Sequence, residues 1–66
     1  MKYTKAQMKQ MLTNRACSLK QERARLLSEA NRLDQLGNYN DADVYYCSAR
    51  ECLTRISEIE MILGLL

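Results

Sequence analysis

The stretch Leu36-Gly37-Asn38-Tyr39-Asn40 is the one clear interruption of helical patterning in this chain of 66 residues. Gly37 suits the left-handed backbone conformation that ends a helix, and Asn38 or Asn40 can cap the helix that follows. The interruption therefore predicts a turn between two helices.

The outer ends of these helices carry their own signals. Thr4, followed three residues later by Gln7, predicts a capping box at the start of the first helix. Gly64 suits a helix C-terminus and predicts the stop of the second helix.

Together these signals predict helices over about residues 5–36 and 39–63. Asp41 and Asp43 would place negative charge in the first turn of the second helix, where the helix dipole favours it. The chain has no proline and only two glycines, which argues against most β-rich folds. We expect an all-α fold with a single helical-hairpin domain over residues 1–66, of which residues 1–10 form a basic N-terminal arm.

Apolar residues recur at the heptad spacing of helices that pack side by side. When the chain is folded at its turn, the two stripes face each other in seven antiparallel layers whose residue numbers sum to 75. Four of these layers set an alanine against a larger side chain, which predicts a close helix pair. The stripes are Leu12, Ala16, Leu19, Arg23, Leu26, Ala30 and Leu33 on the first helix, and Ala42, Tyr45, Ala49, Cys52, Ile56, Ile59 and Leu63 on the second.

Arg23 is the one charged residue in this seam. We expect its aliphatic stem to lie along the seam and its guanidinium to pair with Glu51 or with a neighbouring subunit.

A single line of contact between two helices buries little apolar surface for a chain of this length. Further apolar residues lie beside the seam, so we expect the hairpin to dimerise into a four-helix bundle. A different protein on this surface, or a bend that makes a three-helix monomer, stays an open alternative. The expected dimer or partner interface consists of Met11, Leu27, Leu36, Tyr46, Leu53 and Ile62.

The residues that usually carry chemistry are scarce. The chain has no histidine, which removes the commonest general base and zinc ligand, and no glycine-rich phosphate loop. Cys17, Cys47 and Cys52 form no CxxC pair, and the hairpin register keeps them too far apart for a disulfide. We expect them to fill the core in a reducing compartment. No catalytic, cofactor or metal site is predicted.

No run of residues approaches the length of a membrane span, and the N-terminus lacks the apolar core of a signal peptide. We therefore expect a cytoplasmic protein without a membrane partner.

Charge is divided unevenly along the chain. Residues 1–25 hold seven basic residues and one acidic, whereas residues 26–66 hold three basic and seven acidic. The basic part could contact phosphates or an acidic protein. The reading we favour is that it pairs with the acidic end of the second helix, where Arg15 lies level with Glu60. The candidate nucleic-acid or acidic-partner contacts are Lys2, Lys5, Lys9 and Arg15.

The segment Ala30-x3-Asp34-x2-Gly37-Asn38-Tyr39-x2-Ala42-x3-Tyr46-x2-Ala49 resembles the hairpin of a tetratricopeptide repeat. It is also similar to part of the microtubule-interacting-and-transport domain. The tetratricopeptide likeness implies a peptide-binding module. The chain departs from that repeat because it has one copy and lacks the proline after the second helix.

The predicted architecture is similar to the plasmid-encoded Rop type of helical hairpin, which implies a dimer that binds RNA loop pairs. The size, helicity and reduced cysteines also resemble small accessory proteins of lambda-like temperate phages. That likeness implies binding to host or phage machinery, in the host cytoplasm. The leading hypothesis is a non-enzymatic regulatory protein that dimerises and binds a protein partner. The alternative is a Rop-like regulator that binds RNA or DNA through the basic half of its first helix.

Overall fold

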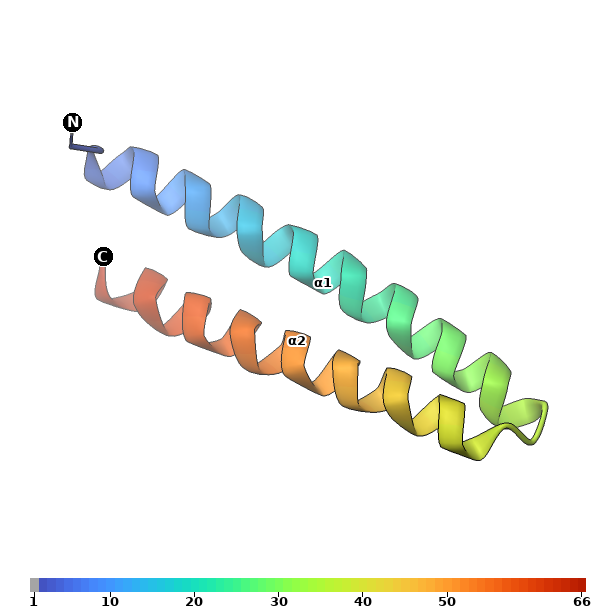
Figure 1. The fold of residues 1–66 in the computed structure, drawn as a ribbon. Helices are drawn as coiled ribbons and strands as arrows, with labels where there is room; N and C mark the ends of the chain where they lie inside the picture. The colour runs from blue at the N-terminus through green and yellow to red at the C-terminus, as the bar shows by residue number, and fades with distance from the viewer. Residues whose placement is uncertain (1) are drawn as a thin grey trace.

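The computed structural model describes residues 2–66. They form two long helices, α1 (Lys5–Gln35) and α2 (Tyr39–Leu65), which run antiparallel along their whole length. The hairpin measures 50 × 18 × 15 Å, and both termini lie at the same end (Figure 1). We call this the open end and the opposite end, at Gly37, the loop end. The predicted all-α hairpin is confirmed.

The turn at the loop end follows from Gly37. This residue has a φ of 84°, the left-handed conformation that costs a residue with a Cβ atom free energy. The Gly37 N–H donates to the carbonyl of Asp34 at 3.0 Å, and the Asn38 N–H donates to the carbonyl of Leu33 at 2.9 Å. These two bonds form a Schellman motif, which satisfies carbonyls that the end of α1 would otherwise leave free.

The capping box at the start of α1 is confirmed. The Gln7 N–H donates to Thr4 Oγ1 at 3.1 Å, and the Thr4 N–H donates to Gln7 Oε1 at 2.9 Å. The side chain of Thr4 thereby fixes the residue at which α1 begins.

At the start of α2 the predicted N-cap position of Asn38 is confirmed without a side-chain bond, whereas the predictions that Gly64 ends the helix and that Asp43 lies in its first turn are wrong. Asn38 occupies the N-cap position but makes no side-chain capping bond, and Asn40 lies inside the helix. The Schellman motif has already fixed the backbone of Asn38. The helix also continues through Gly64, whose φ is not positive, and the Leu66 N–H bonds to the carbonyl of Leu63. Of the two predicted aspartates, Asp41 alone lies in the first turn.

The core is the predicted seam. Every buried hydrophobic residue of the described chain belongs to one of the two predicted stripes. One cluster joins Leu19 with Ile56 and Leu26 with Ala49, which are two of the predicted layers, and includes Cys52. The most deeply buried residues are alanines: Ala30 is 0 % exposed, and Ala42 and Ala49 are each 1 % exposed. Small side chains therefore bring the two helices close together.

The two glycines provide a matched test of the turn. Gly37→Ala places a Cβ on a left-handed residue and should lower the free energy of unfolding by about 1–2 kcal/mol. Gly64→Ala should leave it unchanged or raise it by up to about 1 kcal/mol, because the helical backbone there leaves open space around a Cβ. Urea unfolding followed by circular dichroism measures both changes, and equal effects of the two substitutions would contradict this account of the turn.

Candidate functional site

The helix pair has two long faces, one on each side of the seam. Successive residues of a helix are about 100° apart, so residues that precede and follow a core residue lie on opposite sides. Arg15 and Arg55 each precede a core alanine or isoleucine, whereas Leu27 and Leu53 each follow a core residue. We call the first side the Arg55 face and the second the Leu27 face.

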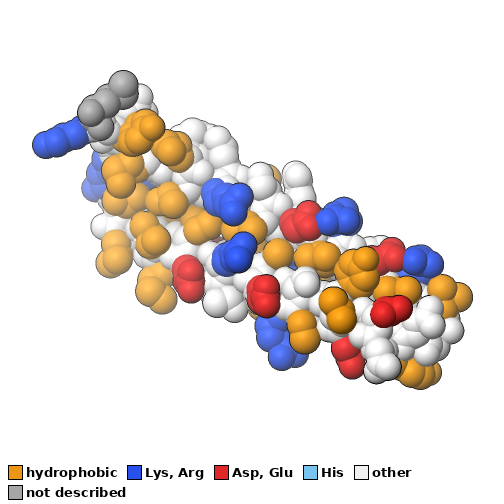
Figure 2. Space-filling model, viewed as in Figure 1, with side chains coloured by type: hydrophobic (Ala, Val, Ile, Leu, Met, Phe, Trp, Pro, Cys, Tyr) orange, Lys and Arg blue, Asp and Glu red, His pale blue; other side chains and the backbone are white. Residues whose placement is uncertain are grey.

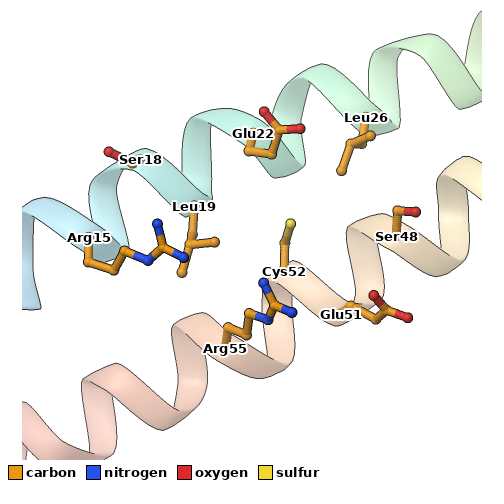
Figure 3. Close-up of a pocket in the computed structure, with 9 residues that line it drawn as sticks. All are labelled: Arg15, Ser18, Leu19, Glu22, Leu26, Ser48, Glu51, Cys52 and Arg55. Carbon is orange, nitrogen blue, oxygen red and sulfur yellow. The ribbon is translucent and has the colours of Figure 1, made fainter.

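The Arg55 face holds a groove of about 510 Å³ between α1 and α2. Within the described chain no third element lies over it, so it opens to solvent along its length. Arg15 comes from α1 and Arg55 from α2, and Cys52 points from α2 toward α1 at the floor (Figure 3). The lining residues are Arg15, Ser18, Leu19, Glu22, Leu26, Ser48, Glu51, Cys52 and Arg55.

Two ion pairs lie along α1 on this face, and Glu22 of the first pair also lines the groove. Arg25 donates to Glu22, and Arg32 donates to Glu29, each across three residues of one helix. The hydrogen bond to Glu22 raises the pKa of Arg25, and the hydrogen bond to Glu29 raises the pKa of Arg32. The bond from Arg32 lowers the pKa of Glu29.

The lowered pKa of Glu29 determines how its ion pair contributes to the stability of the fold as the pH changes. A carboxylate with a lowered pKa in the folded state contributes stability above its unfolded pKa and loses it as the pH falls through the folded pKa. Because the pair is exposed, its contribution is small and screened by salt.

The Leu27 face holds a smaller groove of about 230 Å³. Leu27 and Tyr46 are half-buried there, and Leu53 is 44 % exposed. Toward the open end the face is bounded by an ion pair, in which Lys20 Nζ lies 3.7 Å from Glu60 Oε1. The lining residues are Arg23, Leu27, Tyr46, Ala49, Arg50 and Leu53.

Apolar side chains line two adjoining grooves at the open end. One groove of about 290 Å³ and an adjoining one of about 280 Å³ share Tyr3 and Met11. Figure 2 shows hydrophobic side chains gathered over this end of the helix pair. The two grooves are lined by Tyr3, Gln7, Met8, Gln10, Met11, Leu12 and Ile62. We call this surface the open-end patch.

The structure divides the six residues predicted as one interface. Leu27, Tyr46 and Leu53 come together on the Leu27 face, whereas Met11 and Ile62 meet at the open-end patch. Leu36, 63 % exposed, lies apart from both at the loop end.

Sequence reasoning missed six exposed apolar residues, which are Tyr3, Met8, Tyr39, Val44, Met61 and Leu65. Tyr3 and Met8 belong to the open-end patch, and Tyr39, 64 % exposed, begins α2. The spacing of Met8 three residues before Met11 was a usable signal, since such residues share a helix face. The spacing of Tyr39 seven residues before Tyr46 was another.

The cysteines differ from the expectation of core filling. Cys52 is buried as predicted, but Cys17 and Cys47 are exposed because they lie on the outer sides of their helices. All three are free thiols. Within residues 2–66, no group of three or more histidine, cysteine or acidic residues is placed to hold a metal ion.

The basic candidates Lys2, Lys5, Lys9 and Arg15 are all exposed. The expected pair of Arg15 with Glu60 is absent, because Arg15 lies on the Arg55 face and Glu60 lies on the Leu27 face, where it pairs with Lys20. None of the ion pairs found among residues 2–66 includes one of the four candidates.

None of the helices described is both long and apolar enough to span a bilayer. Comparison of the chain with models of protein families, with curated proteins and with solved structures gave no match.

Arg23 has an unexpected environment at the seam. Its Nε atom is buried and has no hydrogen-bond partner, and the expected pair with Glu51 is not among the ion pairs of residues 2–66. A buried donor without an acceptor destabilises a fold by about 1–3 kcal/mol.

In the single hairpin, at concentrations too low for association, Arg23→Leu should therefore leave the free energy of unfolding unchanged or raise it, because it removes this donor and keeps an apolar stem in the seam. Arg25→Leu is the matched control two residues away, since it loses an exposed ion pair and should lower stability slightly. Thermal melts of both variants compare them. A loss of more than about 2 kcal/mol in Arg23→Leu would show that the guanidinium stabilises the fold.

Proposed function

We propose that this chain is a non-enzymatic interaction protein, a helical hairpin that dimerises and binds a protein partner. The exposed surface of the hairpin carries the proposal. It exposes 5213 Å², whereas a compact monomer of 7.7 kDa exposes about 4,300 Å². The excess of roughly 900 Å² is comparable to the area of about 800 Å² that one partner contributes to a stable protein interface.

The side chains that make up this surface support the same proposal. No large side chain of the described residues is fully buried, so the apolar residues beside the seam can gain burial by association. A surface that is open along two helices favours contact with another protein more than enclosure of a small substrate.

The open-end patch is the proposed site for the protein partner. Its grooves are concave, and the side chains of a helix from another protein can enter them. Methionine is flexible and polarizable, and it adapts to the shape of such partners. The partner's origin in a host or a phage stays a prediction from the likeness in size, helicity and cysteines to small phage accessory proteins.

Charge placed in the open-end patch should abolish partner binding. The double variant Met11→Glu/Ile62→Glu should retain helicity, because both residues are about half exposed, at 52 % and 45 %. Val44→Glu is the matched control, since Val44 is 63 % exposed and lies in the loop half of the hairpin. Affinity capture from source cells should give one protein in stoichiometric amount with the wild type and with the control. The amount of that protein captured by the double variant should be lower by at least about tenfold. Capture that is equal in all three would contradict the assignment of the patch.

A second candidate function is RNA or DNA binding. The observation that favours it is the absence of ion pairs at Lys2, Lys5, Lys9 and Arg15, which leaves four cations near the open end free to contact phosphates. No stacking platform accompanies them, because Tyr3 is the one aromatic residue in this part of the chain.

Salt dependence separates the two functions. If these four cations neutralise phosphates, the affinity for duplex DNA should fall by about 100-fold between 50 mM and 200 mM salt. Reversal of charge at Lys5, Lys9 and Arg15 should abolish that binding. Fluorescence anisotropy with generic RNA and duplex DNA measures both effects, and absence of binding at 50 mM salt would remove this candidate.

A further inference from the structure

We propose that a second copy of this chain packs its Leu27 face on the Leu27 face of the first. The two copies are related by a two-fold axis beside Tyr46, and their loop ends point in opposite directions. The inference rests on the proposed function because it assumes that the hairpin dimerises. It adds the face, the orientation and the residues in contact.

The apolar surface of the Leu27 face has a definite centre. Tyr39, Tyr46 and Leu53 are seven residues apart and therefore form one stripe along α2. Their exposure, 64 % at Tyr39 and 44 % at Leu53, leaves the stripe open to a partner. Tyr46 lies at its middle and lines the groove together with Leu27 of α1.

A two-fold axis that passes beside Tyr46 packs the stripe of one copy against the stripe of the other. In an antiparallel pair of α2 helices, Tyr46 then contacts Tyr46 of the second copy, and Leu53 contacts Tyr39. Aromatic side chains of this kind are the usual anchors of protein interfaces. The interface ends at the loop end of the second copy, before it reaches the Lys20–Glu60 ion pair.

Basic and acidic residues of the Leu27 face lie on opposite sides of Tyr46. Arg23 and Arg50 line the groove on the side toward the open end. Asp43 lies seven residues before Arg50, and Asp34 lies seven residues after Leu27, so both aspartates lie on the same face toward the loop end. None of the ion pairs found among residues 2–66 uses an aspartate or either of these arginines.

The two-fold axis pairs these opposite charges. A reversed second copy places its Asp43 beside Arg50 and its Asp34 beside Arg23, each pair formed twice by symmetry. The guanidinium of Arg23, whose Nε has no acceptor in the single hairpin, then has a carboxylate nearby. In the other two-fold arrangement, with both loop ends at the same end, Arg23 and Arg50 would meet the arginines of the second copy. Repulsion between like charges disfavours that arrangement.

The Arg55 face is a poorer interface for a second copy. Its groove is lined by four charged side chains of both signs, which would lose their water on burial. The Leu27 face has two charged residues in its lining, and the proposed orientation gives both of them a carboxylate.

Cross-linking at the two-fold axis tests the orientation. Tyr46→Cys is made in the background Cys17→Ser/Cys47→Ser, which removes the two exposed thiols and keeps buried Cys52. Mild oxidation should join Tyr46→Cys chains to one another as covalent dimers. Ser48→Cys in the same background is the matched control on the Arg55 face and should give none. Cross-linking of Tyr46→Cys to Leu27→Cys chains in a mixture, without Tyr46→Cys homodimers, would establish the other orientation and overturn the proposal.

Charge exchange tests the ion pairs independently. Arg50→Asp and Asp43→Arg should each raise the dimer dissociation constant about tenfold, because each variant sets like charges against each other at two symmetric places. The double variant Arg50→Asp/Asp43→Arg should restore dimerisation, with helicity by circular dichroism as the check on folding. Failure of the double variant to recover would overturn the proposed register.

Equilibrium sedimentation separates failure of this inference from failure of the proposed function. A mass of about 15 kDa, twice that of the 7.7 kDa chain, together with cross-links elsewhere would overturn only the face and orientation. A well-folded monomer at high micromolar concentration would overturn dimerisation itself.

Discussion

The close contact between α1 and α2 at alanine layers is the constraint on which the rest of the structure depends. Ala30, Ala42 and Ala49 are the most deeply buried residues of the described chain, and none of its large side chains is fully enclosed. Small residues allow a near approach of the helices, but a seam made of them is narrow. The larger residues of the stripes therefore fill the edges of the seam, and their neighbours in sequence remain exposed on both faces.

Much of the fold could be predicted from the sequence because its determinants are local. The left-handed Gly37 and the Thr4–Gln7 capping box act within a few residues, and the heptad stripes define which residues face each other. Gly64 failed as a stop signal because a glycine permits a left-handed turn without requiring one, and the backbone there stays helical. Asn38 takes the predicted N-cap position, but its side chain makes no capping bond there, and its N–H belongs to the Schellman motif at the end of α1.

The candidate site was less predictable because it depends on the side of the seam on which each residue lies. In the sequence, Leu27 and Met11 are both apolar residues next to the heptad stripe of the first helix, yet in the structure they belong to different surfaces. Heptad position relative to the nearest core residue contains this information, and so does the spacing of Tyr39, Tyr46 and Leu53. The partner of Glu60 follows the same rule, because Arg15 precedes a core residue whereas Lys20 and Glu60 each follow one, so Lys20 shares the Leu27 face with Glu60 and Arg15 does not.

The hairpin divides along its length as well as across its seam. Between Leu26 and Ala49, the loop half carries four acidic residues and one basic residue, whereas the remainder carries nine basic and four acidic. Two reversed copies that overlap near their loop ends would bring acidic loop halves beside the arginines of the Leu27 faces and leave both open ends projecting outward. The open-end patch and its unpaired lysines would then remain accessible at both ends of the dimer. In this arrangement, the same uneven charge that orients the proposed dimer also keeps the open-end patch, the proposed site for a protein partner, out of the dimer interface, so the two proposed associations do not compete for one surface.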